Sequence, residues 1–438
     1  ILVDCGLYQG NEELEQRNWR WFAFEPHELK AVLVTHAHLD HTGLLPRLVN
    51  KGFEGPIYCT RPSRGLISLI LQDAGHLQEE QARFARKKGY SPHPDPAPLY
   101  TAKDSRKTIK MLRPLAFDDS HEIVPGVHVR FRRAGHLLGA SSLEIMAKGS
   151  DSKRRTWVFS GDVGRYDVPI IKDPEPPIEA PDSLVLESTY GDRRHQETEP
   201  EADFRRVIRR TFGRGGTVII PAFALGRTQE VLYHLSQLVD DGELDPRDVF
   251  LDSPMAIRAT DIYRQATAEH DEDLKELVEQ HLNPLDPDRF ERCRSAEQSK
   301  ALNDRREPAV IVAASGMATG GRVVHHLKHR LGDERTSVVF VGYQAAGTRG
   351  RALVDGTQMV AIHGDPVPVR AEIQQLHGLS AHADRSELLR WVAELPALPA
   401  RIFLNHGEDP PRKTLAAALH QEGLERPRMP ATGDSVPW

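Results

Sequence analysis

Four metal-ligating side chains within six residues constrain this chain more than any other feature. Residues 35–43 read THAHLDHTG and place His36, His38, Asp40 and His41 directly after an apolar run. Imidazole and carboxylate groups are good ligands for divalent metals such as zinc. A solvated or core histidine explains any one of these residues but not all four at this spacing. The loop therefore predicts a metal site, in which His36 and His38 hold one ion while Asp40 and His41 reach a second.

Two further residues are candidate ligands, because a site for two metals needs more donors and one that bridges. His136 lies in AGHLLGA and Asp162 lies in FSGDVG, each after a strand-like run. Taken alone, His136 is equally well explained as a structural residue and Asp162 as a turn residue. Their order and their positions at strand ends favour the metal-ligand interpretation for both.

Composition sets limits on the remaining possibilities. At 438 residues the chain exceeds the size of one typical core, which predicts two domains or one domain with a large insertion. A net charge of −6 neither indicates nor excludes a polyanion partner, since bound dications can attract phosphate locally. No run approaches the roughly 20 apolar residues of a membrane span, and the first residues lack signal-peptide features, so we expect a cytosolic protein. Cys5, Cys59 and Cys293 lie too far apart for a thiolate zinc site.

The strand and helix signals change near residue 196. Before it, strand-like runs alternate with site loops, and residues 121–163 read as adjacent antiparallel strands joined by hairpins. From 196 to 350, apolar strands alternate strictly with helices, which predicts a parallel sheet with crossover helices. Ligands of such sheets bind at the carboxyl ends of the strands, and the absence of GxGxxG argues against a dinucleotide.

The motifs together resemble a known family. HxHxDH after a strand, a lone His in a glycine-flanked loop and an Asp in SGD are similar to the metallo-β-lactamase hydrolases. Asp4, in LVDCG, matches the first motif of that fold. The resemblance implies that Asp4 contacts the histidine ligands from behind and fixes their tautomer and direction.

Three later motifs resemble the β-CASP branch of this superfamily, whose members cut nucleic acids. They are LESTYGD (186–192), GLSAHAD (378–384) and FLNHGE (403–408). The resemblance implies an α/β fold: a metallo-β-lactamase αββα sandwich with an inserted Rossmann-like, parallel-sheet β-CASP domain. The implied domains are residues 1–195, 196–350 and 351–438, the last completing the first. The initial strand that the family places before its first motif is missing from this sequence.

The same resemblance implies two Zn²⁺ ions per chain and a proton donor. One zinc would take His36, His38, His136 and Asp162, and the other Asp40, His41, His406 and a bridging Asp162. Glu187 and His382 would pair as the proton donor to the leaving group. The predicted catalytic residues are therefore Asp40, Glu187 and His382.

Histidine at position 406 resembles the RNA-cleaving members of the branch. The whole pattern is similar to prokaryotic ribonucleases related to the endonuclease subunit of the mRNA 3′-end processing machinery. We expect zinc-dependent hydrolysis of single-stranded RNA that leaves a 5′-phosphate and a 3′-hydroxyl. The alternatives are a DNA nuclease, a small-molecule ester or thioester hydrolase, and a catalytically silent RNA-binding subunit. Internal and 5′-end attack both stay open, and a homodimer is compatible with the sequence.

Substrate contacts are predicted at two places. Ser315 and Gly316 lie in ASGMATGGR, between a strand and a helix start, where free backbone N–H groups favour a phosphate. A tight strand-to-helix turn is the competing interpretation. Ser380, two residues before His382, is the second candidate for contact with a phosphate oxygen.

Overall fold

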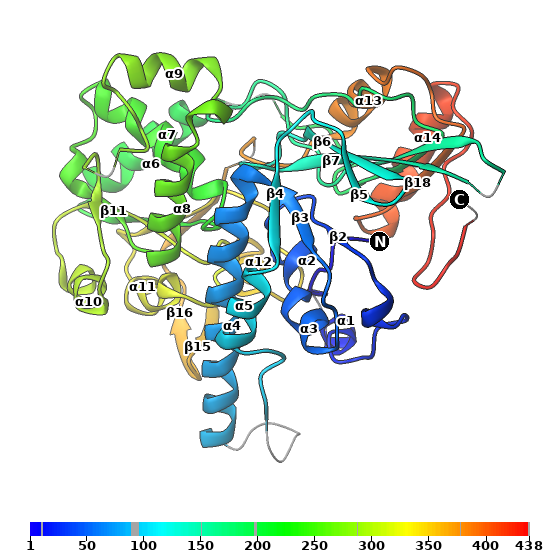
Figure 1. Ribbon diagram of the computed structural model, residues 1–438. Coiled ribbons are helices and arrows are strands. Elements are labelled where there is room, and N and C mark those ends of the chain that lie inside the picture. The colour runs from blue at the N-terminus through cyan, green and yellow to red at the C-terminus, as the bar shows by residue number, and fades with distance from the viewer. Residues whose placement is uncertain are drawn as a thin grey trace. The chain divides into compact units, whose positions relative to one another are not determined.

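The protein is represented by a computed structural model with two compact units. It describes residues 1–9, 12–88, 96–149, 151–196, 199–286, 288–376 and 378–436. Unit 1 consists of Ile1–Asp167, Lys172–Arg194 and His382–Trp438, and unit 2 of Val168–Ile171 and His195–Ala381. Unit 2 is therefore an insertion in the chain of unit 1, and the colours of Figure 1 show this order along the sequence.

The first sheet of unit 1 is parallel. Its strands, in spatial order, are β1 (Leu2–Val3), β2 (Val32–Leu33), β3 (Ile57–Thr60) and β4 (Leu112–Leu115). The helices in this part of the chain are α1 (Glu12–Arg17), η1 (Pro26–Glu28), α2 (Leu39–Thr42), α3 (Leu45–Asn50), α4 (Arg61–Lys88) and α5 (Ala102–Ile109). The apolar run before the histidine loop contributes β2, whose two residues are fully buried, as expected for a parallel sheet.

The second sheet of unit 1 has six strands in the order β18-β9-β8-β7-β6-β5. Their bounds are β5 (His121–Val124), β6 (Val127–Arg133), β7 (Ser141–Lys148), β8 (Arg154–Phe159), β9 (Ser183–Leu186) and β18 (Arg401–Leu404). Strands β5 to β8 pair antiparallel, which confirms the hairpins predicted for residues 121–163. Strands β8, β9 and β18 pair in parallel, so the C-terminal part of the chain completes this sheet.

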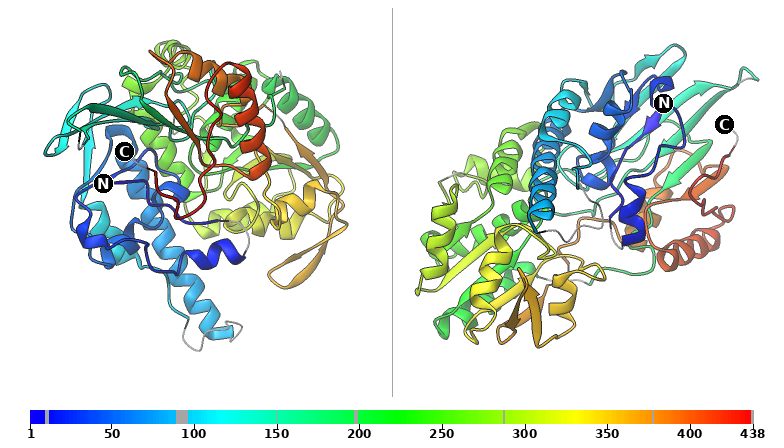
Figure 2. Two further views of the ribbon diagram at one scale, coloured as in Figure 1. Left: turned by 90° about the vertical axis from the view of Figure 1, so that its right-hand side faces the viewer. Right: turned by 90° about the horizontal axis from the view of Figure 1, so that it is seen from below.

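Two apolar cores hold unit 1 together as four layers. Between the sheets, Leu33 of β2 packs in one cluster with Phe131 of β6 and Leu143 of β7. On the outer face of the six-stranded sheet, strands β8 and β9 pack against Trp391 of α13 (Arg385–Ala393) and Leu415 of α14 (Asp409–Gln421). Figure 2 shows these two helices side by side in orange and red. The predicted αββα sandwich is confirmed.

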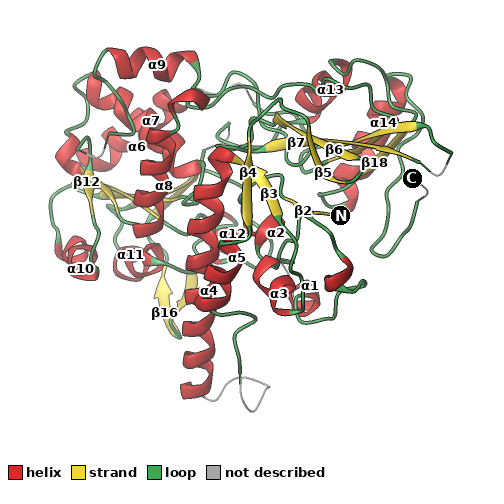
Figure 3. Ribbon diagram, viewed as in Figure 1, coloured by secondary structure: helices red, strands yellow, loops and turns green. Residues whose placement is uncertain are grey.

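Unit 2 is built around a six-stranded parallel sheet in the order β12-β11-β13-β10-β14-β17. Its strands are β10 (Thr217–Pro221), β11 (Val249–Leu251), β12 (Glu291–Arg292), β13 (Ala309–Ala313), β14 (Ser337–Phe340) and β17 (Glu372–Gln375). Its helices are α6 (Pro200–Gly213), α7 (Arg227–Asp240), η2 (Pro246–Asp248), α8 (Pro254–Gln265), η3 (Thr267–Glu269), α9 (Glu272–Glu279), α10 (Ala296–Asp304), α11 (Arg322–Arg330) and α12 (Arg349–Val354). Figure 3 distinguishes these helices from the strands by colour.

The alternation of side chains along a strand explains why this sheet has apolar cores on both faces. Val218 and Ile220 belong to the core formed with α6, α7 and α8, whereas Ile219 belongs to the core formed with α11 and α12. The parallel sheet with crossover helices predicted for residues 196–350 is confirmed.

Residues 351–381 pack with unit 2. Strand β17 pairs with β14, and β15 (Met359–Ile362) forms a hairpin with β16 (Asp365–Pro368) whose apolar side chains join the α11 core. The chain thus re-enters unit 1 at His382. These units are defined by packing, and the domain boundaries at residues 195 and 350 stay a prediction.

Two expectations from composition concern cysteine and membranes. Cys5, Cys59 and Cys293 are buried free thiols, and burial raises the pKa of each. Among the described residues, we find no helix with the length and apolarity that crossing a membrane requires.

One buried ionic network in unit 2 is expected to matter for stability. Asp252, which directly follows β11, is fully buried and accepts hydrogen bonds from Arg322 Nη1 (2.6 Å), His326 Nε2 (2.6 Å) and Ser299 Oγ (2.5 Å). Burial opposes ionisation of this carboxyl, but these donors lower the pKa of Asp252. Removing one partner of such a network leaves the others buried without their counter-charge.

We therefore predict that Asp252→Ala lowers the free energy of unfolding by about 3 kcal/mol. Asp365→Ala, which removes an exposed ion pair with Lys328, should cost less than about 1 kcal/mol. Urea unfolding followed by circular dichroism measures both. All five tryptophans fall within the ranges of unit 1, so tryptophan fluorescence reports on the unfolding of unit 1 alone. The urea midpoint measured by fluorescence should be the same in both variants as in the parent. Equal costs for the two variants would contradict the prediction.

Candidate metal centre

The loop after β2 positions the first four candidate ligands. His36 and His38 lie on the extended segment that ends at the start of α2, and Asp40 and His41 lie on the first turn of that helix. Gly6 packs against this turn so closely that a Cβ atom there would lie 1.5 Å from the carbonyl oxygen of Asp40. The DCG segment after β1 therefore sets the position of the helix that carries two of the candidates.

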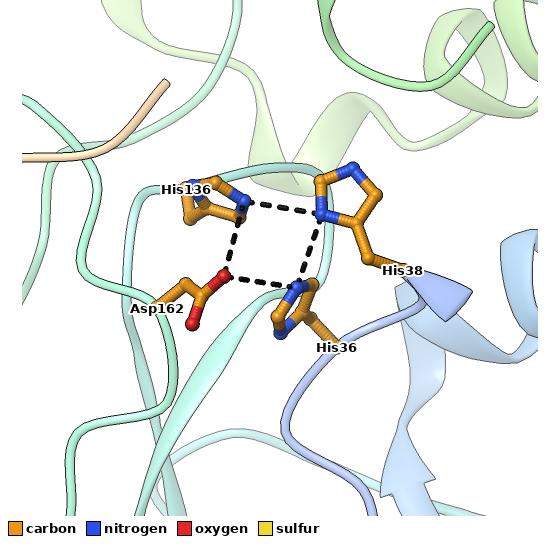
Figure 4. A group of neighbouring side chains, drawn as sticks. All are labelled: His36, His38, His136 and Asp162. Atoms are coloured by element: carbon orange, nitrogen blue, oxygen red, sulfur yellow. Dashed lines mark hydrogen bonds and ion pairs between the residues drawn. The ribbon is translucent and has the colours of Figure 1, made fainter. Parts of the chain in front are cut away.

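Four residues form the first group of candidate ligands. Their ligand atoms all lie within 4.8 Å of one another, and their side chains point toward a common centre (Figure 4). His38 Nδ1 is 3.1 Å from His36 Nε2 and 3.2 Å from His136 Nε2. Asp162 Oδ2 is 3.5 Å from His36 Nε2 and 3.7 Å from His136 Nε2. The structure thus brings together the four residues that the sequence assigned to one metal.

The second group consists of Asp40, His41 and His406. His406 Nε2 lies 3.3 Å from Asp40 Oδ2. The other oxygen of Asp162, Oδ1, lies 3.3 Å from His41 Nε2 and 3.5 Å from His406 Nδ1. One carboxylate therefore directs one oxygen to each group, which is the arrangement predicted for a bridging ligand.

The donor atoms of both groups fit metal ions. His41 Nε2 and Asp162 Oδ1 are buried and have no hydrogen-bond partner, although such atoms are usually satisfied. Burial lowers the pKa of His36 well below its ordinary value and lowers that of His38 to about 4, so both imidazoles are neutral at pH 7. A neutral imidazole offers the lone pair that a metal requires. These clusters are suited to bind metal.

The two aspartates carry the negative charge of the site. Burial alone would raise the pKa of Asp162, but His406, His41 and His36 hold it well below its usual range. A hydrogen bond from His406 similarly overcomes burial and lowers the pKa of Asp40. In return these carboxylates raise the pKa of His406 to about 9, against the effect of its burial. Both carboxylates are therefore ionised, and the neighbouring imidazoles balance part of their charge.

The structure places Asp4 against Thr35 and His41, next to the candidate ligands. Its Oδ1 accepts from the backbone N–H of Thr35 (2.8 Å), and its Oδ2 accepts from Thr35 Oγ1 (2.8 Å) and His41 Nδ1 (2.7 Å). The bond to Nδ1 leaves Nε2 of His41 facing Asp162. Asp4 directly follows β1 and has a left-handed backbone (φ 56°), which few non-glycine residues adopt. This backbone conformation accompanies its contacts with Thr35 and His41.

Glu187 and His382 form the third group, again with Asp162. His382 Nδ1 lies 3.2 Å from Glu187 Oε1 and 3.9 Å from Asp162 Oδ2. Glu187 is 2% exposed, and its oxygens accept from the backbone N–H groups of Val163 and Thr189. Burial opposes charge on His382, but the adjacent Glu187 raises its pKa above the ordinary value. The pair suits a histidine that carries a proton.

Two threonines in the site were missed from the sequence. Thr35 Oγ1 lies 3.1 Å from His36 Nδ1, besides its bond to Asp4, and Thr189 Oγ1 lies 3.1 Å from His406 Nδ1. Thr35 thus contacts the nitrogen of His36 that does not face Asp162, whereas Thr189 contacts the nitrogen of His406 that also lies near Asp162. Only their positions in the sequence could have indicated these two residues: Thr35 directly precedes HAHLDH, and Thr189 follows Glu187 by two residues.

The three predicted substrate residues belong to unit 2. Ser315 and Gly316 lie in the loop between β13 and α11, and Ser380 lies just before the chain returns to unit 1. The loop is a tight turn whose own backbone carbonyls accept from Ser315, Ala318 and Val323 N–H groups. Phosphate contact by these residues stays a prediction.

Comparisons with known proteins agree with this geometry. Three family models match the chain: the metallo-beta-lactamase superfamily at residues 1–189, the Beta-Casp domain at 228–353, and the Zn-dependent metallo-hydrolase RNA specificity domain at 366–430. Together they include the loop of His36, the inserted unit and the segment that carries His382 and His406.

Curated relatives match over nearly the whole chain. Ribonuclease TTHA0252 from Thermus thermophilus is 37% identical over 439 residues, which cover 100% of this chain and 94% of that protein. Transcription termination factors FttA from Methanocaldococcus jannaschii and Methanosarcina mazei are 32% and 33% identical, over 93% and 96% of this chain. The chain spans only 63% and 65% of the lengths of these two factors.

The contacts of Asp4 lead to a prediction about metal affinity. We expect Asp4→Asn to weaken metal binding about 10- to 100-fold, because the carboxylate accepts at both oxygens whereas an amide has only one acceptor oxygen, so the bond to the Thr35 N–H or those to Thr35 Oγ1 and His41 Nδ1 would be lost. Competition with a chromogenic chelator measures the affinity, and Asp119→Asn, at an exposed position, is the matched control. Unchanged affinity in Asp4→Asn would show that this carboxylate does not orient the ligands.

Proposed function

This chain belongs to the β-CASP branch of the metallo-β-lactamase superfamily, a family of hydrolases, and we propose that it is a two-zinc ribonuclease acting on single-stranded RNA. One observation carries the proposal: the ion pair of His382 and Glu187 stands beside the carboxylate of Asp162, which faces both groups of candidate ligands. A proton donor next to a two-metal centre suits the hydrolysis of a phosphodiester.

Zinc is proposed because the donor set is rich in imidazole. His36, His38, His136 and Asp162 would hold one ion, and Asp40, His41, His406 and Asp162 the other. Two such ions supply Lewis acidity toward phosphate oxygens and lower the pKa of water. The exposure of the ligands defines the open side: His36 is fully buried, whereas the side chains of Asp40 and His406 are 38% and 29% exposed.

His382 would act as the general acid. Glu187 engages Nδ1, which leaves Nε2 to give a proton to the departing oxygen. Hydrolysis adds water to phosphorus and breaks the bond to O3′, and the proton from Nε2 neutralises that oxygen. The products are a 3′-hydroxyl and a 5′-phosphate. Because the pKa of His382 is raised by Glu187, the imidazole holds the proton until the oxygen leaves.

RNA is proposed as the substrate on the basis of the comparisons. A model named for RNA specificity matches the segment that carries His382 and His406, and a relative that matches the full chain is named a ribonuclease. A single strand is proposed because several candidate ligands are buried, His36 fully so, and a flexible single strand brings a phosphate to a recessed centre more easily than a wide, stiff duplex does.

We predict that His382→Ala lowers the rate of RNA cleavage about 10²- to 10⁴-fold while the protein keeps its metal, because only the proton donor is lost. The assay uses one internally labelled single-stranded RNA and its DNA counterpart, and elemental analysis gives the metal content. His128→Ala, which removes an exposed histidine of β6, should cleave like the parent. The lengths of the fragments distinguish internal from 5′-end attack.

Other outcomes of this assay identify the rival functions. DNA cut as fast as RNA would indicate a nuclease without sugar preference. Cleavage of neither polymer by metal-loaded protein would contradict the proposal and favour a small-molecule hydrolase or a silent RNA-binding subunit. Duplex RNA cut as fast as the single strand would reject the proposed preference for unpaired RNA.

We further predict that removing metal with a chelator abolishes cleavage and that about two equivalents of zinc per chain restore it, since two groups of ligands share Asp162. Titration of metal-free protein with zinc gives the number of ions. Asp162→Asn should bind both ions weakly, because the bridging charge is lost. Full activity with one equivalent, or restoration only by another metal, would contradict the zinc assignment.

A further inference from the structure

Two large aromatic side chains are exposed at the carboxyl edge of the unit 2 sheet. Phe223 follows the end of β10 by two residues and is 38% exposed, and Tyr343 follows the end of β14 by three residues and is 44% exposed. Strands β10 and β14 are neighbours in this parallel sheet. Ligands of such sheets bind at the edge where the carboxyl ends of the strands meet.

The strand register and one loop contact place these residues at neighbouring strand ends. The register that pairs Ile219 with Val338, extended by four residues, puts Phe223 level with Gly342. On the other side of β10, Gly316 lies against Phe223 so closely that a Cβ atom there would be 2.8 Å from the ring. The three strand ends of β13, β10 and β14 therefore form one continuous surface.

Gln344 connects the two flanking loops across this surface. Its Nε2 donates to the carbonyl oxygens of Gly316 and Gly342, each at 3.1 Å, and its side chain is buried. The backbone of Phe223 is fixed in turn, since its carbonyl accepts from both the N–H (3.1 Å) and the Oγ1 (2.8 Å) of Thr228. The loops that carry both rings are thus held in place without a ligand, which lowers the entropic cost of binding one.

The chemistry of this edge favours a planar, uncharged group over a phosphate. The Ser315, Ala318 and Val323 N–H groups are used within the loop itself. Two arginines close to the edge are also engaged: Arg322 pairs with Asp252, and Arg349 donates to the carbonyl oxygens of Ala318 and Ala361. The two aromatic rings are exposed, and the arginines near them already bond to protein groups. This edge therefore suits the stacking of a planar group on the rings.

We propose that Phe223 and Tyr343 form a stacking surface for unpaired bases of single-stranded RNA. The proposal rests on the proposed ribonuclease function and identifies residues that hold its substrate. Stacking on an aromatic ring tolerates any base, because every base has a π-face, and it is available only where bases are unpaired. This surface would therefore select for single strands without reading their sequence.

The test is equilibrium binding of a fluorescein-labelled single-stranded RNA by full-length protein, with His382→Ala present to prevent cleavage. Phe223→Leu and Tyr343→Leu should each weaken binding at least about fivefold, because loss of one stacked base corresponds to a factor of that size or more. Phe223→Tyr and Tyr343→Phe keep a ring and should bind like the parent. Trp21→Ala, which removes an 80% exposed ring from unit 1, is the matched control.

An RNA of the same length with abasic residues separates stacking from general destabilisation. The parent should bind this backbone more weakly than normal RNA, and the leucine variants should bind it as the parent does. Stacking at this surface is rejected if the leucine variants bind normal RNA as tightly as the parent. It is also rejected if their affinity for abasic RNA falls by the same factor as their affinity for normal RNA. In both cases the ribonuclease function stands. If the parent binds no RNA, both proposals fail.

Discussion

The carboxylate of Asp162 is the group on which the rest of the centre depends. It is 2% exposed and faces histidines from both groups of candidate ligands, as well as His382. A buried carboxylate is costly unless it is paired, and the surrounding imidazoles keep Asp162 ionised. Gly161 makes the placement possible: its backbone is left-handed (φ 57°), and a Cβ atom there would lie 2.7 Å from the carbonyl of Ser141.

Much of the centre was predictable because its ligands follow strands directly. His36, His38, Asp40 and His41 lie within one loop, so their common location follows from the spacing alone. The meeting of His136, Asp162, Glu187 and His406 followed from a resemblance to a family, not from local pattern, because strand pairing brings these loops together across long stretches of chain. The inserted parallel sheet was predictable from the alternation of strands and helices along the sequence. The αββα sandwich was predictable from the resemblance to the family.

What sequence reasoning missed is non-local or small. Thr35 and Thr189 act through single hydroxyl groups, and threonine is too common in strands and turns to stand out. Strand β17 lies beyond the region of strict alternation, and only its pairing with β14 shows that it belongs to the inserted sheet. The loop at Ser315 reads as an anion site, yet several of its N–H groups bond within the turn, and that can be seen only when the backbone is folded.

The insertion of unit 2 has a consequence for the order in which the site is assembled. Glu187 lies just before the chain leaves unit 1, and His382 is the first residue after it returns, 195 positions later. At the exit, backbone contacts join Arg193 to Arg385 and Tyr190 to Asp384. During translation, the carboxylate of Glu187 can therefore meet His382 only after the whole inserted unit has been synthesised.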